Sequence, residues 1–141
     1  MGIGYVASAH NYYEGRLILA GEEAISPGTL VSADYAAGTA EIGVVSGKPV
    51  FFVAQENDAP IEYGINDVDQ VIEAGKYLKL APLVVGHDYK TTECADGLKA
   101  GDGAKFGSDK KFAKADGADF IVTQVDMVGD VPVYSLHYIG A

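Results

Sequence analysis

The stretch FIVTQVDMVGDVPVYSLHYI, Phe120 to Ile139, predicts a β-hairpin with two unlike faces. Gly129-Asp130 forms the loop, because glycine in first place supplies the positive φ of a type II′ turn. If Val128 lies opposite Val131, strict alternation puts eight mainly apolar side chains on one face, which we expect to be core. They are Met127, Val125, Thr123 and Ile121, opposite Pro132, Tyr134, Leu136 and Tyr138. The other face carries Asp126, Gln124, Ser135 and His137, which suit water or a polar partner.

Pro132 refines the expectation for the last strand. Beside a two-residue loop, its missing N–H points away from the neighbouring strand, so the last strand is expected to be an edge there. Val133, Ser135 and His137 are therefore candidate contacts to a second copy of the chain or to another neighbour.

The composition favours an all-β fold. The 141 residues include 18 glycines, and long-helix formers are scarce, so turns must be many and helices few. We expect a single-domain antiparallel β-barrel or β-sandwich over residues 16–141, with an extended N-terminal arm over residues 1–15 and a C-terminal hairpin.

Charge and termini limit the classes of partner. Ten basic and twenty acidic residues give a net charge of −10, which repels nucleic acid and anionic membranes, so neither is an expected partner. Cys94 is the single cysteine, so no internal disulfide is expected. The first ten residues lack the basic segment and long apolar core of a secretion signal, and the protein is expected to be made in the cytoplasm.

The first thirteen residues contain no Asp, Glu, Lys or Arg and are rich in tyrosine. Such a terminus is either a frayed end or an arm that becomes ordered against another surface, since tyrosine gives contact area at low entropic cost. In the arm interpretation, the binding residues are Tyr5, His10, Tyr12 and Tyr13.

Short strands and turns follow the arm. The expected strands are Arg16 to Ala20, Thr29 to Ala33, Glu41 to Val45, Val50 to Gln55, Tyr77 to Leu80 and an exposed Tyr89 to Glu93. The polar stretch Asp96 to Gly117 holds five lysines, which are expected to form a solvated face or to protect an edge. Gly28, Gly75 and Gly101 each follow an apolar residue by three positions and precede an expected strand, which indicates a recurring strand-turn-strand geometry.

Motifs for catalysis are not found. No zinc spacing, phosphate-binding loop or nucleophile elbow occurs, so we expect a non-enzymatic protein with no cofactor and no metal. Two alternatives stay open. A small hydrolase or lyase would use His87, Asp88 and Cys94, and a carbohydrate- or receptor-binding module of a phage fibre or tail would stack Tyr63, Tyr77 or Tyr89 on sugar rings.

Three segments, EAISPGTLV (Glu23 to Val31), AEIGVV (Ala40 to Val45) and VIEAGKYLKL (Val71 to Leu80), resemble the head decoration proteins of tailed bacteriophages, also called cement or capsid-stabilising proteins. The resemblance covers roughly Glu22 to Leu80 and, through the glycine pattern, Leu98 to Gln124. It implies a β-barrel or sandwich with a terminal arm and no catalytic residues. It also implies a dimer or trimer on the outer surface of the virion head, where it would bind the major capsid protein at joints between subunits and stabilise the expanded head.

Overall fold

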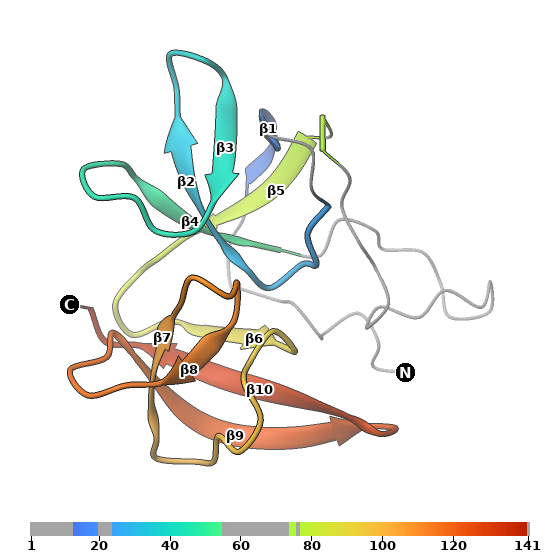
Figure 1. Ribbon diagram of the computed structural model, residues 1–141, viewed down its shortest axis with the longest axis vertical. Coiled ribbons are helices and arrows are strands. Elements are labelled where there is room, and N and C mark those ends of the chain that lie inside the picture. Colours follow the sequence, from blue (N-terminus) through green and yellow to red (C-terminus); the bar gives the residue numbers. More distant parts are fainter. Residues whose placement is uncertain (1–12, 20–23, 55–73, 76, 141) are drawn as a thin grey trace.

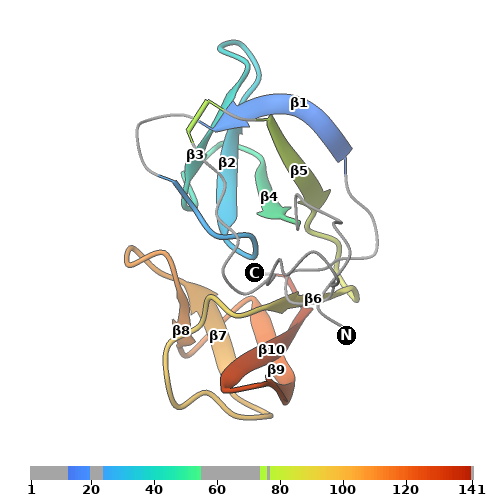
Figure 2. The ribbon, with the colours of Figure 1, turned by 90° about the vertical axis from the view of Figure 1, so that its right-hand side faces the viewer.

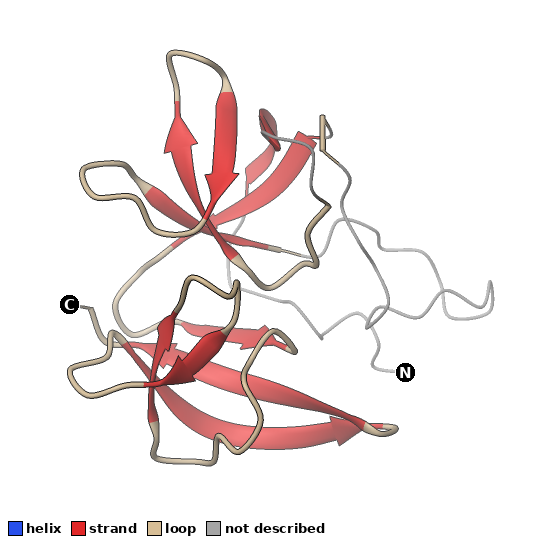
Figure 3. Ribbon diagram, viewed as in Figure 1, coloured by secondary structure: helices blue, strands red, loops and turns tan. Residues whose placement is uncertain are grey.

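The protein is an all-β molecule, as the composition predicted. A computed structural model describes residues 13–19, 24–54, 74–75 and 77–140, which form ten strands and no helix (Figure 3). The strands are β1 (Tyr13–Leu19), β2 (Leu30–Asp34), β3 (Thr39–Ile42), β4 (Val50–Val53), β5 (Tyr77–Pro82), β6 (Asp88–Thr91), β7 (Gly103–Phe106), β8 (Phe112–Lys114), β9 (Phe120–Val128) and β10 (Val131–Tyr138).

The first five strands pair into a small closed barrel in the order β1-β3-β2-β4-β5. Its strand pairs are antiparallel, as predicted, except that β1 runs parallel to β3 where Ile18 and Leu19 meet Thr39 and Ala40. Since β1 begins at Tyr13, the last three residues of the predicted arm belong to a barrel strand instead. The arm before the barrel is therefore at most residues 1–12.

The last five strands form a second sheet in the order β6-β10-β9-β7-β8. Starting from the third strand of each half, the two orders are β3-β2-β4-β5-β1 and β8-β7-β9-β10-β6, so the halves repeat one topology. The repeat extends to the closing contact, because Cys94, just after β6, and Phe112 of β8 form a parallel bridge. One strand arrangement thus occurs twice in the chain.

The three glycines singled out in the sequence have one common role. Gly28, Gly75 and Gly101 have φ of +99°, +84° and +95°, and the next strand begins two residues after each of them. Their N–H groups donate to the carbonyl oxygens of Val53, Leu19 and Val122 at 2.8, 3.0 and 2.7 Å. Since only glycine adopts such φ values without strain, the recurring geometry predicted from the sequence is confirmed.

Two apolar clusters fill the molecule. One lies within the barrel and includes Leu19, Val31 and Leu78. The other combines barrel residues Leu30, Phe52 and Ala81 with second-sheet residues, among them Tyr89, Phe112, Phe120 and Leu136. The barrel and the second sheet lie one above the other in Figures 1 and 2, and the second cluster is the core that joins them.

The predicted hairpin is present, but its register changes at Thr123. Gly129 has φ +62° and Val128 pairs with Val131, which confirms the turn and the starting register. Thr123 has no partner on β10, and this bulge places Val122 opposite Leu136 and Phe120 opposite Tyr138. Phe120 and Val122 are therefore core residues, whereas Thr123 and Ile121 are not, contrary to the strict alternation predicted from the sequence.

β6 is more buried than the sequence predicted. The segment Tyr89 to Glu93 was expected to be an exposed strand, but Tyr89 and Thr91 are fully buried, since β6 packs against the barrel.

The lysines in the polar stretch Asp96 to Gly117 form a solvated face, as predicted. Lys99, Lys105, Lys111 and Lys114 are exposed, and β8 is an edge strand of the second sheet.

Candidate interaction surfaces

The β9–β10 hairpin extends beyond the sheet as a two-stranded ribbon, residues 123–133 (Figure 1). β9 pairs with β7 at Phe120 and Ile121, and Val122 exchanges hydrogen bonds with Gly101 and Asp102. Within the described residues, nothing pairs with β9 from Thr123 onward except β10. The outer half of β9 is thus an open strand edge.

The geometry of the turn determines which backbone groups face this open edge. Val128 and Val131 flank a two-residue loop and so exchange hydrogen bonds with each other. In an antiparallel ladder the next pair has its groups pointing outward, and the pattern then alternates. The N–H and C=O of Met127 and Val125 therefore point away from β10, into the open edge.

The ribbon continues the core face of the sheet into solvent. Val125 and Met127 pair with Tyr134 and Pro132, which share a face of β10 with the core residue Leu136. Val125 is 37% exposed and Met127 is 62% exposed, because the ribbon extends past the core. On the opposite face, the amide of Gln124 donates to the carboxylate of Asp126 at 2.7 and 2.8 Å.

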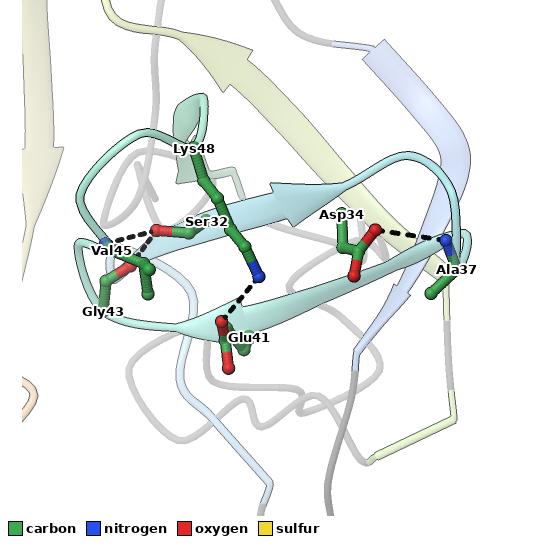
Figure 4. Close-up of polar contacts among 7 residues, drawn as sticks. All are labelled: Ser32, Asp34, Ala37, Glu41, Gly43, Val45 and Lys48. Atoms are coloured by element: carbon green, nitrogen blue, oxygen red, sulfur yellow. Dashed lines mark hydrogen bonds and ion pairs between the residues drawn. The ribbon is translucent and has the colours of Figure 1, made fainter.

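The barrel exposes two large apolar side chains on braced loops. Tyr35, in the β2–β3 turn, is 62% exposed, and Val44, in the β3–β4 loop, is 57% exposed. The first turn is fixed by Asp34, whose carboxylate accepts a hydrogen bond from the N–H of Ala37 at 3.2 Å (Figure 4).

Ser32 fixes the second loop from the buried side. Its hydroxyl donates to the carbonyl of Gly43 at 2.7 Å and accepts from the N–H of Val45 at 2.8 Å, so the backbone on both sides of Val44 is held (Figure 4). Lys48 and Glu41 form an ion pair at 3.2 Å across the same loop. These contacts brace the loop that carries Val44.

A third apolar surface lies at the end of the second sheet. Val84, Val85 and Ile139 are exposed. They are brought together because the N–H of Gly86 donates to the carbonyl of Tyr138, and the N–H of Tyr138 donates to the carbonyl of His87.

The predicted arm residues are mostly outside the part of the chain that the structure describes. Tyr5, His10 and Tyr12 fall there, and Tyr13 is the first residue of β1, where its backbone pairs with Leu80.

The candidate edge contacts on β10, Val133, Ser135 and His137, do not lie at an open strand edge as expected, except at Val133. Residues 134–137 pair with both β9 and β6, so β10 is an interior strand at Ser135 and His137. Val133 and Ser135 are buried, and His137 lies 2.6 Å from the carboxylate of Asp88. The prediction that the last strand is an edge is therefore wrong for the middle of β10. The open edge belongs to β9, and no sequence signal distinguished the two strands.

The proposed nucleophile of the hydrolase alternative is in an unfavourable place. Cys94 is buried, and desolvation together with the nearby Glu93 raises the pKa of its thiol from 9.0 to about 12. Because the thiolate is the reactive form, this environment suppresses nucleophilic chemistry. Asp88, the second member of that cluster, is hydrogen-bonded to His137.

The tyrosines of the sugar-binding alternative are also constrained. Tyr89 is buried, and its hydroxyl donates to the carbonyl of Pro82 at 2.6 Å and accepts from the N–H of Val84 at 2.9 Å. Burial raises the pKa of Tyr89, and its ring packs on Phe52. It cannot stack on a sugar ring. Tyr63 lies outside the described residues, and for Tyr77 the structure describes only the backbone.

The part of the chain that the structure describes contains no group of three or more His, Cys, Asp or Glu side chains that could hold a metal ion, and no helix that could cross a membrane. Comparisons with protein families, with curated proteins and with solved structures find no match.

Proposed function

We propose that the protein decorates the outer surface of a tailed-phage head, where it binds the major capsid protein and stabilises the expanded shell. One observation supports this function best. The barrel contains most of the segments that resemble decoration proteins, and it presents two exposed apolar side chains, Tyr35 and Val44, on loops held by internal hydrogen bonds.

Rigid loops of this kind suit contact with a preformed protein surface. An exposed aromatic or branched side chain contributes most to binding when its loop is already ordered, because little conformational entropy is then lost. The barrel also begins at β1, so the uncharged, tyrosine-rich residues 1–12 enter the fold on this half of the molecule. Loops and arm together would give several modest contacts, which a symmetric oligomer multiplies on a shell with many identical sites.

Cosedimentation with expanded, undecorated phage heads tests the proposal. We expect saturable binding at a fixed ratio to capsid subunits. The double variant Tyr35→Ser, Val44→Ser should bind about tenfold or more weakly, because it removes two apolar contacts without touching the core. Lys105→Ser, an exposed change on β7, is the matched control and should bind normally.

A truncation that removes residues 1–12 but retains Tyr13 separates the arm from β1. We expect a folded protein that binds heads poorly. Full binding by the truncated protein would show that the arm does not contribute to head binding. Full binding by the double loop variant would show the same for the two loops. No binding of the native chain to any tailed-phage head would overturn the proposed function itself.

A further inference from the structure

We propose that the open edge of β9 pairs with the same edge of a second copy of this chain, in an antiparallel arrangement centred on Val125. This pairing does not depend on capsid binding. It concerns the free protein and gives the ribbon, residues 123–133, a role in self-association.

As far as the structure describes the chain, the backbone of β9 has unpaired hydrogen-bonding groups at its open edge. The N–H and C=O of Val125 and Met127 point into an edge that no described strand occupies. Pro132 has no N–H to donate on the corresponding part of β10, so the tip of the ribbon can accept a regular strand on the β9 side alone. Unpaired outward groups on an extended strand are a template for another strand.

The same part of β9 exposes an apolar face. A soluble protein ordinarily protects such an edge with charge, proline or a twist away from neighbours. Beside the single charge of Asp126, the outer half of β9 carries Val125, 37% exposed, and Met127, 62% exposed, on the face that is core elsewhere in the sheet. Pairing of two ribbons about Val125 would bring the two Val125 side chains next to each other, with Met127 opposite Thr123 of the second copy.

Complementarity selects the second copy and the centre of the pairing. A two-fold axis through Val125 places Gln124 directly opposite Asp126 of the second copy, twice per dimer. Gln124 and Asp126 are already hydrogen-bonded to each other within one chain, so the same donor and acceptor can bond across the interface. An axis through Asp126 would instead oppose two like charges, which is unfavourable.

The register can be tested with single cysteines in an otherwise native chain, because the one native cysteine, Cys94, is buried. Across the axis, the two Val125 Cα atoms would lie about 5.5 Å apart, within the range of a disulfide. The two Met127 Cα atoms would lie about 14 Å apart, since four residues of strand separate them. Under mild oxidation Val125→Cys should form a covalent dimer at least about tenfold faster than Met127→Cys.

Random collision between molecules would favour the opposite order of cross-linking rates. Met127 is the more exposed of the two positions, so unspecific contacts would cross-link Met127→Cys first. Faster cross-linking of Met127→Cys, equal rates, or no cross-link in either variant would overturn the proposal. If the open edge binds a coat-protein strand and not a second copy, neither variant should cross-link in the free protein.

Charge substitutions provide a second measurement that does not use cysteine. Gln124→Lys would face Asp126 of the second copy, and Gln124→Glu would repel it. Sedimentation equilibrium should show dimer dissociation constants that differ by about tenfold or more, with the Lys variant tighter. Asp116→Asn and Lys105→Gln make the same changes in net charge at exposed sites away from the open edge of β9 and are the controls. If these controls move the dissociation constant as far as the Gln124 variants do, the effect is one of net charge and the pairing is refuted.

Discussion

At the scale of single residues, the buried Cys94 thiol makes the free energy of unfolding depend on pH in the alkaline range. Its pKa is raised from 9.0 to about 12, so the folded thiol keeps its proton where the unfolded chain loses it. The folded state then binds more protons, and its stability falls as pH rises from 9 towards 12. The contribution is complete below pH 9 and is lost at about 1.4 kcal/mol per pH unit above it.

Urea unfolding of the native chain and of Cys94→Ala, in reducing buffer at a series of pH values, measures this contribution. The variant is expected to be less stable at pH 7, because it loses packing in the shared core. The difference between the two proteins should shrink above pH 9. Tyr89, Tyr134 and Tyr138 also have raised pKa values, but they are present in both proteins, so parallel curves would contradict the role of Cys94.

At the scale of elements, the bulge at Thr123 determines which side chains of β9 reach the core. With the register held by the Gly129 turn, deletion of Thr123 would remove the bulge and leave Val122 opposite Leu136 and Phe120 opposite Tyr138. Both side chains stay in the core, and only the exposed Thr123 and its hydrogen bond to Ser135 are removed, so we expect the free energy of unfolding to change by about 1 kcal/mol or less. Denaturant titration measures it.

The control for this deletion is Thr123→Ala. It keeps the number of residues and removes only the 3.3 Å hydrogen bond from the Thr123 hydroxyl to the carbonyl of Ser135. Its cost should be about 1 kcal/mol or less, because Thr123 is exposed. A deletion variant much less stable than this control would show that the bulge itself is needed to hold Phe120 and Val122 in the core.

The same element shows how far the sequence determines the fold. The turn could be predicted because its chemistry is local: Gly129 supplies a positive φ between two apolar runs. The bulge could not be predicted, because Ile121, Val125 and Met127 form as good an apolar series as Phe120 and Val122, and the choice is made by packing against the barrel. The open edge of β9 was missed for a related reason, since the pairing of β6 with β10 joins residues distant in sequence.

At the scale of the whole molecule, the repeated topology leaves few marks in the sequence, the clearest being Gly28 before β2 and Gly101 before the equivalent strand β7. The turn glycines recur because their φ values admit little else, whereas the strands between them need only be apolar in the right places. The interaction surfaces of the barrel were not predicted either. Tyr35 and Val44 look in the sequence like any other apolar residues near turns, and their exposure depends on how Ser32 and Asp34 hold the loops.

The two halves depend on each other where Gly28 meets Thr91. The hydroxyl of Thr91 donates to the carbonyl of Gly28 at 2.9 Å, and a Cβ added at Gly28 would lie 2.1 Å from that hydroxyl oxygen. Gly28→Ala would therefore push β6 off the barrel and also place alanine at φ +99°. We expect a cost of about 3 kcal/mol or more. Gly47→Ala has a similar φ of +82° and nothing within 4 Å, so it should cost only about 1–2 kcal/mol of backbone strain.

Hydrogen exchange in the two variants distinguishes a local clash from a joint that couples the halves. Because Phe52 of the barrel packs on Tyr89 of β6 in the shared core, separation at Gly28 exposes apolar surface on both sides. Gly28→Ala should then lower the protection of amides in β2, β4, β9 and β10 together. Loss of protection confined to the turn before β2 would mean that the halves are stable independently, and that their common core contributes little to either.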